Sequence, residues 1–151
     1  MTAFLKTYLF AADRAWTYER ECFPALKRGC LVLWDRYVDS ALAYRAVELA
    51  MKKEQLDLEF VKTINKPFRT PDLIFLIDIS LRTYEERNHG RAGTSPYATE
   101  FLRNVRKEYK RLARQRAYII VDGERPLSTV ADEIVSHIKG RFEELFTSCG
   151  C

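Results

Sequence analysis

The sequence predicts an α/β fold in which the strands of a parallel sheet alternate along the chain with amphipathic helices. Three short apolar runs carry the strand pattern, at residues 31–34 (LVLW), 72–79 (DLIFLIDI) and 118–121 (YIIV). Continuous apolar runs of this length are typical of strands buried on both faces. Segments with helical periodicity separate the runs, which favours parallel strands joined by helical crossovers. We therefore expect a parallel sheet with flanking helices.

Length and composition favour one globular domain over residues 1–151. Of these residues 47% are hydrophobic and 30% are charged, which suits a chain with a buried core. The net charge of +4 is too small and too spread to predict nucleic-acid binding. No apolar run approaches the roughly 18 residues of a membrane span. The cysteines are scattered without metal-ligand spacing, which favours reduced thiols and a cytoplasmic protein.

Helices are expected where capping signals flank a helical periodicity of apolar residues. The expected helices are 2–26, from Asp39 or Ser40 to about 53, about 57–65, one from Ser95-Pro96, and one from Ser128 or Thr129. Lys27-Arg28-Gly29 is a basic, glycine-terminated end for the first of them.

The stretch 31–44 (LVLWDRYVDSALAY) is the first candidate for a functional site. Asp35 and Arg36 directly follow an expected strand, at the edge where ligands bind to α/β sheets. Arg36 offers a fork of donors to phosphate oxygens, and Asp35 can hold a metal-bound water or orient a neighbouring donor. The alternative is an ordinary salt bridge at a strand end. Ser40 and Tyr44 are one helical turn apart and share a face.

Two further segments carry candidate ligand contacts. Phe10 and Arg14 are four residues apart in the first helix, so a ring can face a base while the guanidinium faces its phosphate. The alternative places Phe10 in the core and leaves Arg14 as a solvated charge. Residues 82–95 carry Arg87 and Arg91 close to glycines, a composition that favours a mobile lid supplying charge to phosphoryl transfer.

Taken in order, these motifs resemble the thymidylate kinase family, nucleoside-monophosphate kinases of the phosphate-loop fold. The resemblance covers nearly the whole chain and runs through LFAADRA (9–15), DRYVDSALAY (35–44), LDLEFVKTIN (56–65), PDLIFLIDIS (71–80) and YIIVDGERPLSTVADEI (118–134). It implies a three-layer α/β fold and the conversion of ATP and dTMP to ADP and dTDP with Mg2+. It also implies a homodimer, which is common in this family.

The resemblance implies a role for each candidate residue. Substrate contacts are implied for Phe10, Arg14, Arg36, Ser40 and Tyr44, and catalytic roles for Asp35, Arg36, Arg87 and Arg91. Phe10 matches the ring that stacks on thymine, and Arg14 matches the arginine that grips the monophosphate. Asp35 and Arg36 match the family's Asp-Arg pair, in which the arginine bridges the donor and acceptor phosphates and the acid helps to organise metal and water. Tyr44 matches a tyrosine whose edge disfavours a ribose 2′-hydroxyl.

Two positions depart from the family pattern. Ala41 stands where the family usually presents a polar side chain to the base, and an alanine cannot hydrogen-bond a pyrimidine edge. Arg45 stands where the family often has a small or amide residue. It is expected either to face solvent or to bind another acceptor.

A larger departure is that no segment matches Gly-x-x-x-x-Gly-Lys-[Ser/Thr], the loop that cradles ATP phosphates. We expect the chain to begin downstream of that loop and of the family's first strand, as an incomplete phosphate-loop kinase fold with three recognisable strands. Phosphoryl transfer depends on positioning and charge, so such a chain is expected to be inactive by itself. Two alternatives stay open: a non-catalytic, nucleotide-binding pseudokinase, and an assembly partner that completes its sheet with another chain.

Overall fold

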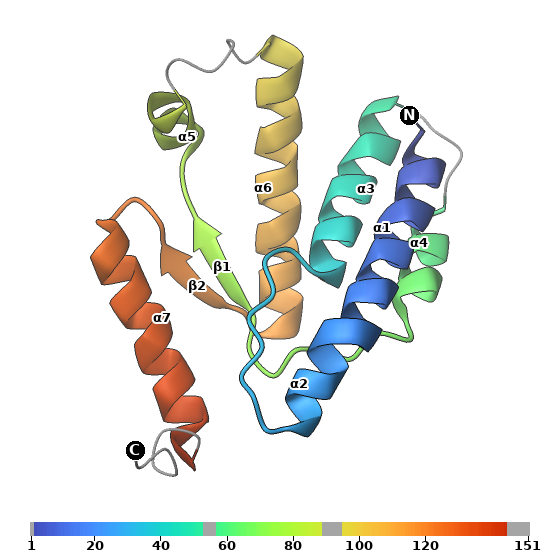
Figure 1. Ribbon diagram of the computed structural model, residues 1–151. Coiled ribbons are helices and arrows are strands. Elements are labelled where there is room, and N and C mark those ends of the chain that lie inside the picture. Colours follow the sequence, from blue (N-terminus) through green and yellow to red (C-terminus); the bar gives the residue numbers. More distant parts are fainter. Residues whose placement is uncertain (1, 53–56, 89–94, 145–151) are drawn as a thin grey trace. The chain divides into compact units, whose positions relative to one another are not determined.

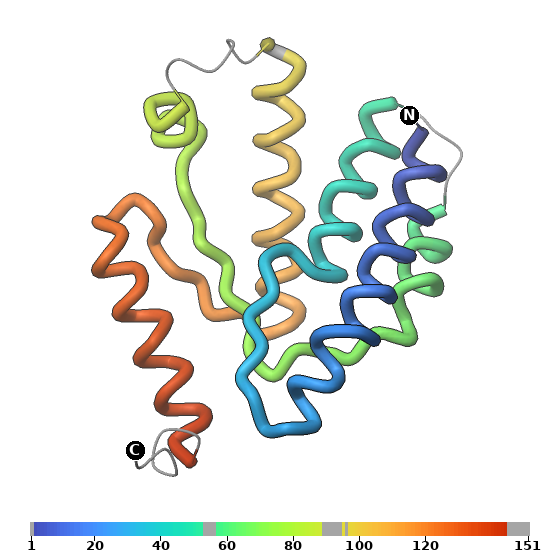
Figure 2. Tube along the Cα trace, in the orientation of Figure 1, coloured from blue at the N-terminus to red at the C-terminus, as the bar shows by residue number. Residues whose placement is uncertain are grey.

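The structure, a computed structural model, describes residues 2–52, 57–88 and 95–144. The chain divides into two compact units, Met1–Thr70 and Pro71–Cys151, and each is described by itself. Figure 1 labels their elements, and Figure 2 traces the same path as a tube. The single-domain expectation stays a prediction. Among the described residues, no helix has both the length and the apolar character that a membrane crossing requires.

The first unit is helical. Its elements are α1 (Ala3–Thr17), the π-helical turn η1 (Tyr18–Cys22), α2 (Phe23–Lys27), α3 (Val38–Lys52) and α4 (Leu58–Asn65). The helices α1, α3 and α4 contact one another pairwise, with α1 running alongside α3 in Figure 1. Helix α3 begins at Val38, so Asp39 and Ser40 lie in its first turn and the prediction that one of them caps it is wrong.

The expected helix over residues 2–26 is confirmed as a nearly continuous helical run that changes type once. Thr2 caps α1, its side chain accepting a hydrogen bond from the Leu5 N–H. The π-turn η1 precedes Pro24, which has no N–H to continue the α-helical ladder. Gly29 ends the run with φ = +77°, as the Lys27-Arg28-Gly29 signal predicts.

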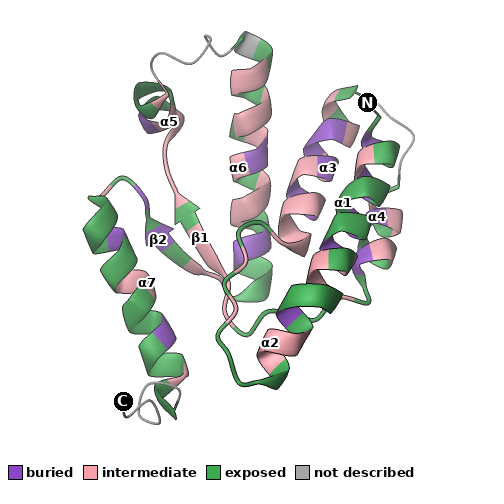
Figure 3. Cartoon of the chain, in the orientation of Figure 1, coloured by how far each residue is buried: buried purple, intermediate pink, exposed green. Residues whose placement is uncertain are grey.

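One face of α1 is covered, and it is not the face with the large apolar residues. Ala3, Thr7, Ala11 and Arg14 form the buried stripe. The large apolar side chains of this helix are exposed, and they are Phe4, Leu5, Tyr8, Leu9, Phe10 and Trp16. Figure 3 shows α1 as largely exposed. Small side chains on the buried stripe let α3 and α4 approach closely, and Arg14 is the one charge among them.

The expected strand at residues 31–34 is wrong. This segment has no regular secondary structure and pairs with no strand among the described residues. Leu33 is 77% exposed and Leu31 is 42% exposed, although a fully apolar run predicts burial on both faces. An extended segment becomes a strand only when a neighbour satisfies its backbone groups. The apolar composition of a segment does not show whether a partner strand is available. Among the described residues, no strand pairs with residues 31–34.

The second unit contains a parallel pair of strands. Its elements are β1 (Phe75–Asp78), α5 (Leu81–Arg87), α6 (Pro96–Arg116), β2 (Ile119–Asp122) and α7 (Leu127–Arg141). The two strands pair in register from Phe75 with Ile119 to Asp78 with Asp122. Helix α6 packs on β1 and α7 packs on β2 (Figure 1). The parallel α/β character and two of the three expected strands are confirmed, whereas the three-layer arrangement stays a prediction.

The helix starts in the second unit are partly as expected. Ser95 caps α6 by accepting from the Ala98 N–H, which confirms the Ser-Pro signal. Helix α7 begins at Leu127 with Pro126 as its N-cap residue, so the prediction of a cap at Ser128 or Thr129 is wrong. Helix α5 was not expected, because all of its residues except Leu81 fall in the segment 82–95 interpreted as a lid.

The turn after β2 is built on a close approach to β1. The Gly123 N–H donates to the Asp78 carbonyl at 2.9 Å. A Cβ added at Gly123 would lie 2.6 Å from Cγ2 of Ile77 and 2.8 Å from Cγ2 of Ile79. Both atoms belong to β-branched side chains that are stiff at χ1, so neither can move aside easily. Glycine is therefore required here for space and not for backbone freedom.

We expect Gly123→Ala to lower the free energy of unfolding by about 1–3 kcal/mol through overpacking. Gly140→Ala is the matched control, because a Cβ there meets nothing within 4 Å and the residue lies in α7. It is expected to raise the free energy of unfolding by up to about 1 kcal/mol through helix propensity. Urea denaturation of both variants measures the difference. A shift in the same direction for both would contradict the packing argument.

Candidate functional site

The centre of the candidate site in the first unit is the guanidinium of Arg14. The side chain is 6% exposed and lies on the covered face of α1. Its Nη1 donates to the Phe10 carbonyl at 3.2 Å, and its Nη2 donates to Oδ1 of Asn65 at 2.9 Å. The alternative in which Arg14 is a solvated helix charge is therefore wrong.

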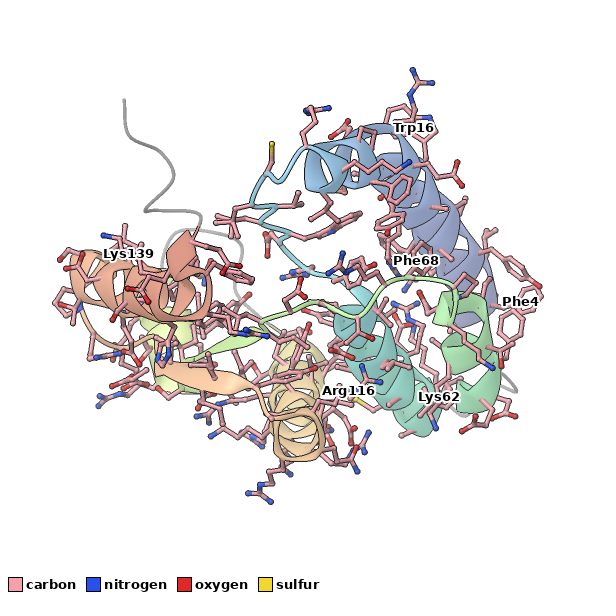
Figure 4. All side chains as sticks on the ribbon, turned by 90° about the horizontal axis from the view of Figure 1, so that it is seen from below. Phe4, Trp16, Lys62, Phe68, Arg116 and Lys139 are labelled. Atoms are coloured by element: carbon pink, nitrogen blue, oxygen red, sulfur yellow. The ribbon has the colours of Figure 1, made fainter. Side chains whose placement is uncertain are left out.

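Two aromatic rings flank the same guanidinium. Its carbon lies 5.3 Å from the ring centre of Phe68 and 5.9 Å from that of Tyr37, within the range of cation–π contacts. The two rings contact each other edge to face, and Tyr37 also contacts Trp34. Figure 4 sets Phe68 inside this unit, whereas Phe4 and Trp16 lie at its periphery.

The charge of Arg14 is not balanced within the described part of the chain. None of the described carboxylates lies within 4.0 Å of it, and its buried Nε has no hydrogen-bond partner there. Burial lowers the pKa of Arg14, and the electrostatic effects of Tyr37 and Asp13 offset part of this shift. Arginine stays protonated in proteins, so the lowered pKa signals a desolvation cost and not a neutral side chain.

Arg45 shows how the same unit treats a buried arginine whose role is structural. It is 5% exposed and its Nη1 lies 2.7 Å from Oε2 of Glu48. The other carboxylate oxygen of Glu48 accepts from Nζ of Lys6 at 2.6 Å, which ties α1 to α3. The expectation that Arg45 faces solvent is wrong: it forms an ion pair with Glu48, although neither Nη1 of Arg45 nor Oε2 of Glu48 makes a hydrogen bond among the described residues. Of these two buried arginines, only Arg14 is left without a counter-charge among the described residues.

The Asp35-Arg36-Tyr37 segment forms a bend immediately before α3. Asp35 and Arg36 are exposed, whereas Tyr37 is half-buried beside Arg14. Arg36 has φ = +60°, a left-handed conformation that costs a non-glycine residue about 1–2 kcal/mol. Its guanidinium lies 5.5 Å from the ring centre of Tyr44. Strained residues of this kind concentrate at functional sites, which makes Arg36 a stronger candidate than its motif alone.

The remaining candidates of this unit lie on α1 and α3. The ring of Phe10 is 54% exposed, so the alternative that places it in the core is wrong. Ser40 and Tyr44 lie one turn apart on α3 and are both half-buried. The structure thus brings Arg14 next to Tyr37 and Arg36 next to Tyr44, all within the first unit.

The lid candidates belong to the second unit. Arg87 ends α5, and its Nη1 donates to the Gly123 carbonyl at 2.9 Å while its Nη2 donates to the Glu124 carbonyl at 3.4 Å. Glu124 in turn accepts from the Ser80 N–H and the Thr83 hydroxyl. Hydrogen bonding to the side chain and then to the backbone of Ser80, together with that to Thr83, lowers the pKa of Glu124. The start of the segment 82–95 is therefore helical and bonded to the turn after β2. Arg91 lies outside the described residues.

The sequence analysis did not predict the ionic cluster at the end of β1. Asp78 accepts from Nε of Arg106 at 2.6 Å and from its Nη2 at 2.9 Å, and Nζ of Lys110 lies 2.8 Å away. The hydrogen bond from Arg106 lowers the pKa of Asp78, with Lys110 contributing in the same direction. These contacts attach α6 to β1. The four-residue spacing of the two cations was the available signal, but it equally suits a solvated helix face.

The sequence analysis also did not predict the contacts of Asn65 and Phe68 with Arg14. Asn65 is 4% exposed and is the last residue of α4. Asparagine is common at helix ends for local reasons, so its position does not indicate a contact with a distant residue. Phe68 lies between two prolines in a connector. Phe68 carries no motif, and Asn65 is only the last residue of the segment LDLEFVKTIN (56–65). The packing of α4 against α1 brings Asn65 to Arg14.

Metal ligands are not clustered in the described ranges. Residues 2–52, 57–88 and 95–144 contain no group of three or more histidine, cysteine, aspartate or glutamate side chains suited to a metal ion.

The comparisons agree on one family. The family profile described as "Thymidylate kinase" matches residues 3–134. A probable thymidylate kinase of Caldivirga maquilingensis is 31% identical over 135 residues, which cover 88% of this chain and 63% of that protein. A probable thymidylate kinase of Pyrobaculum aerophilum is 35% identical over 132 residues, covering 87% of this chain and 66% of that protein. The thymidylate kinase of Halothermothrix orenii is 34% identical over 142 residues, with coverages of 87% and 66%.

The parallel strand pair and the family match together make this an α/β chain of the nucleotide-kinase class. The chain belongs to the thymidylate kinase family. It spans between 63% and 66% of the length of these relatives.

Proposed function

We propose that this chain carries the acceptor site of a thymidylate kinase and binds dTMP through its monophosphate. In the whole enzyme this phosphate accepts the terminal phosphoryl group of ATP, giving ADP and dTDP. The observation that carries the proposal is the buried and unbalanced charge of Arg14. A phosphate dianion is the counter-charge that the site lacks, and a guanidinium fork suits its oxygens.

The contrast between the two buried arginines supports this assignment. A buried charge costs several kcal/mol unless it is paired, so an unpaired one marks a functional position. Arg45 meets that requirement through the carboxylate of Glu48, which it shares with Lys6. The contacts of Arg14 are one amide oxygen, one backbone carbonyl and two aromatic rings, and all of these groups are neutral. The ligand supplies the negative charge.

The other residues of the first unit complete the proposed site. The exposed ring of Phe10 stacks on the base one turn from Arg14. Ser40 and Tyr44 face the sugar and base from α3. In the free protein Arg36 rests on Tyr44, and it turns toward the phosphates when both nucleotides are bound. Asp35, directly before it, orients water and metal in the whole enzyme.

ATP with Mg2+, a homodimer and a cytoplasmic location are part of the same proposal and rest on membership of the family. Arg87 and Arg91 are proposed as the lid arginines. To act there, Arg87 must leave one ordinary hydrogen bond, to the Gly123 carbonyl at 2.9 Å, and one long contact, to the Glu124 carbonyl at 3.4 Å.

Calorimetric titration of the chain with dTMP and with thymidine tests the proposal without depending on phosphoryl transfer. The two ligands differ only in the phosphate, so we expect thymidine to bind about 100-fold more weakly, the loss of a bidentate charge-assisted contact. Titration with dCMP measures whether Ala41 leaves the site tolerant of another pyrimidine. Equal affinities for dTMP and thymidine, or no binding of dTMP, would overturn the proposal.

A further inference from the structure

The positive charge of this protein is concentrated on one helix. Helix α6 contains seven arginine and lysine side chains and two acids, Glu100 and Glu108, so it carries a net charge of +5. The whole chain has a net charge of +4, so the rest of the chain is close to neutral. The small net charge of the chain did not predict nucleic-acid binding, but its concentration on one helix gives a local positive field.

Most of these cations lie on one face of α6. Four of them follow one another at intervals of four, three and four residues, which places them in one line along the helix, namely Arg103, Lys107, Lys110 and Arg114. Arg106 and Arg111 flank this line. At a rise of 1.5 Å per residue the line is about 16 Å long, and the helix that carries it is straight (Figure 1). Val105 and Leu112, which are buried, lie on the opposite side.

Three cations of this line have no partner in the part of the chain that the structure describes. Arg103, Lys107 and Arg114 are exposed, and none of the described residues forms an ion pair or hydrogen bond with them. The fourth, Lys110, is different, because its Nζ lies 2.8 Å from Oδ2 of Asp78 at the end of β1. That ion pair attaches the helix to the strand. The three unpaired residues, the basic row of α6, thus present fixed charges to solvent.

We propose that the basic row of α6 docks on the phosphate backbone of double-stranded nucleic acid. Arginine offers a planar fork of donors to phosphate oxygens, and regularly spaced cations on a rigid helix suit a regularly charged polyanion. Contacts to the backbone carry no base information, so binding is independent of base sequence. None of the residues proposed to bind nucleotide lies on α6, so this surface is independent of the proposed function.

The chemistry of this face favours duplex nucleic acid over other anionic partners. A protein interface has a core of apolar and aromatic side chains, whereas an interface with DNA is polar and strongly positive. A membrane holds a surface helix through an exposed apolar face, but Val105 and Leu112 of α6 are buried. Single strands are held by stacking on aromatic rings. Tyr97, an exposed ring of this helix, lies in its first turn and off the basic row.

Fluorescence anisotropy of the full chain with a labelled DNA duplex of about 20 base pairs tests the proposal. With three phosphates neutralised, we expect the affinity to fall about 40-fold when salt rises from about 50 mM to about 200 mM. A second duplex of unrelated base sequence is expected to bind within about twofold of the first, because the backbone supplies the contacts.

The test variant combines three substitutions, Arg103→Gln, Lys107→Gln and Arg114→Gln. We expect it to bind the duplex at least about 30-fold more weakly at the lower salt concentration and to lose most of the salt dependence. Glutamine has a helix propensity close to that of arginine and lysine, and the three side chains have no described partners to lose. Urea denaturation is therefore expected to give the wild-type midpoint.

A second triple variant controls for the loss of net charge. It removes two arginines and one lysine from exposed positions outside α6, by the substitutions Arg20→Gln, Lys62→Gln and Arg141→Gln. We expect its affinity for the duplex to change less than about threefold, because separated surface charges are screened by salt.

The outcomes are distinct. A loss of duplex binding that is specific to the α6 variant, with unfolding midpoints unchanged, supports the proposal. Absence of duplex binding at the lower salt concentration, or equal losses in the two triple variants, would overturn it. Tighter binding to the single strand of the same sequence, or to vesicles of equal parts phosphatidylcholine and phosphatidylserine, would overturn it as well, because the basic row would then serve another partner.

Discussion

Arg14→Met is expected to lower the affinity for dTMP about 100-fold while the protein becomes no less stable. The loss follows from removing a bidentate, charge-assisted contact worth about 3 kcal/mol. The unchanged or higher stability follows from the burial of Arg14 without a counter-charge among the described residues. Methionine fills similar space without a desolvation cost, and replacing a buried ion by an apolar residue is often stabilising. Calorimetry with dTMP and urea denaturation measure the two quantities.

Arg20→Met is the control for this variant. It removes the same unit charge from the same helical run, at an exposed position where the guanidinium stacks on Trp16. We expect less than a twofold change in dTMP affinity, because exposed charges at a distance are screened by salt. A loss of stability in Arg14→Met comparable to a core substitution, with dTMP binding retained, would show that Arg14 has a structural role.

Glu48→Gln is expected to lower the free energy of unfolding by about 3–5 kcal/mol. Glu48 is the common partner of Lys6 and Arg45, and the side chains of Glu48 and Arg45 are each 7% exposed. Glutamine keeps the shape but removes the charge, which leaves two cations facing each other across α1 and α3. The removal of one member of a buried ion cluster costs more than its formation gains, because the remaining charges stay desolvated.

Glu59→Gln is the matched control for the ionic effect. Glu59 pairs with Lys62 on α4, but the two side chains are 68% and 51% exposed. Water and salt screen that pair, so we expect a change below about 1 kcal/mol. Urea denaturation at low and high salt gives a second measure, since salt is expected to remove only the exposed pair's contribution. Similar losses for the two glutamine variants would contradict the assigned role of burial.

Local chemistry accounts for the parts of the fold that could be predicted from sequence. Ser95 before Pro96 and glycine at position 29 act through hydrogen bonds and dihedral angles within one or two turns. The runs that became β1 and β2 were recognisable because apolar length is itself a strand signal. The run at 31–34 carried the same signal and is not a strand. β1 and β2 each have a partner strand, whereas residues 31–34 have none among the described residues. The composition of one segment does not show whether such a partner is present.

The candidate site divides in the same way. The residue types were recognisable in sequence: an aromatic residue and an arginine one turn apart, and an Asp-Arg-Tyr before a helix. Helical spacing shows which residues share a face, but it does not show which face will be covered. In α1 the buried face carries Ala3, Thr7, Ala11 and Arg14, whereas the large apolar side chains are exposed. This arrangement buries Arg14 and exposes Phe10.

By itself the sequence determined the family, most helices, two strands and the residue types of the site, because these depend on local order along the chain. Only the tertiary structure decided that Arg45 has a carboxylate partner and that Arg14 has an amide. The physical reason is that the cost of a buried charge depends on everything packed around it. Asn65 and Glu48 reach these arginines through packing between and along helices, and no local signal predicts those contacts.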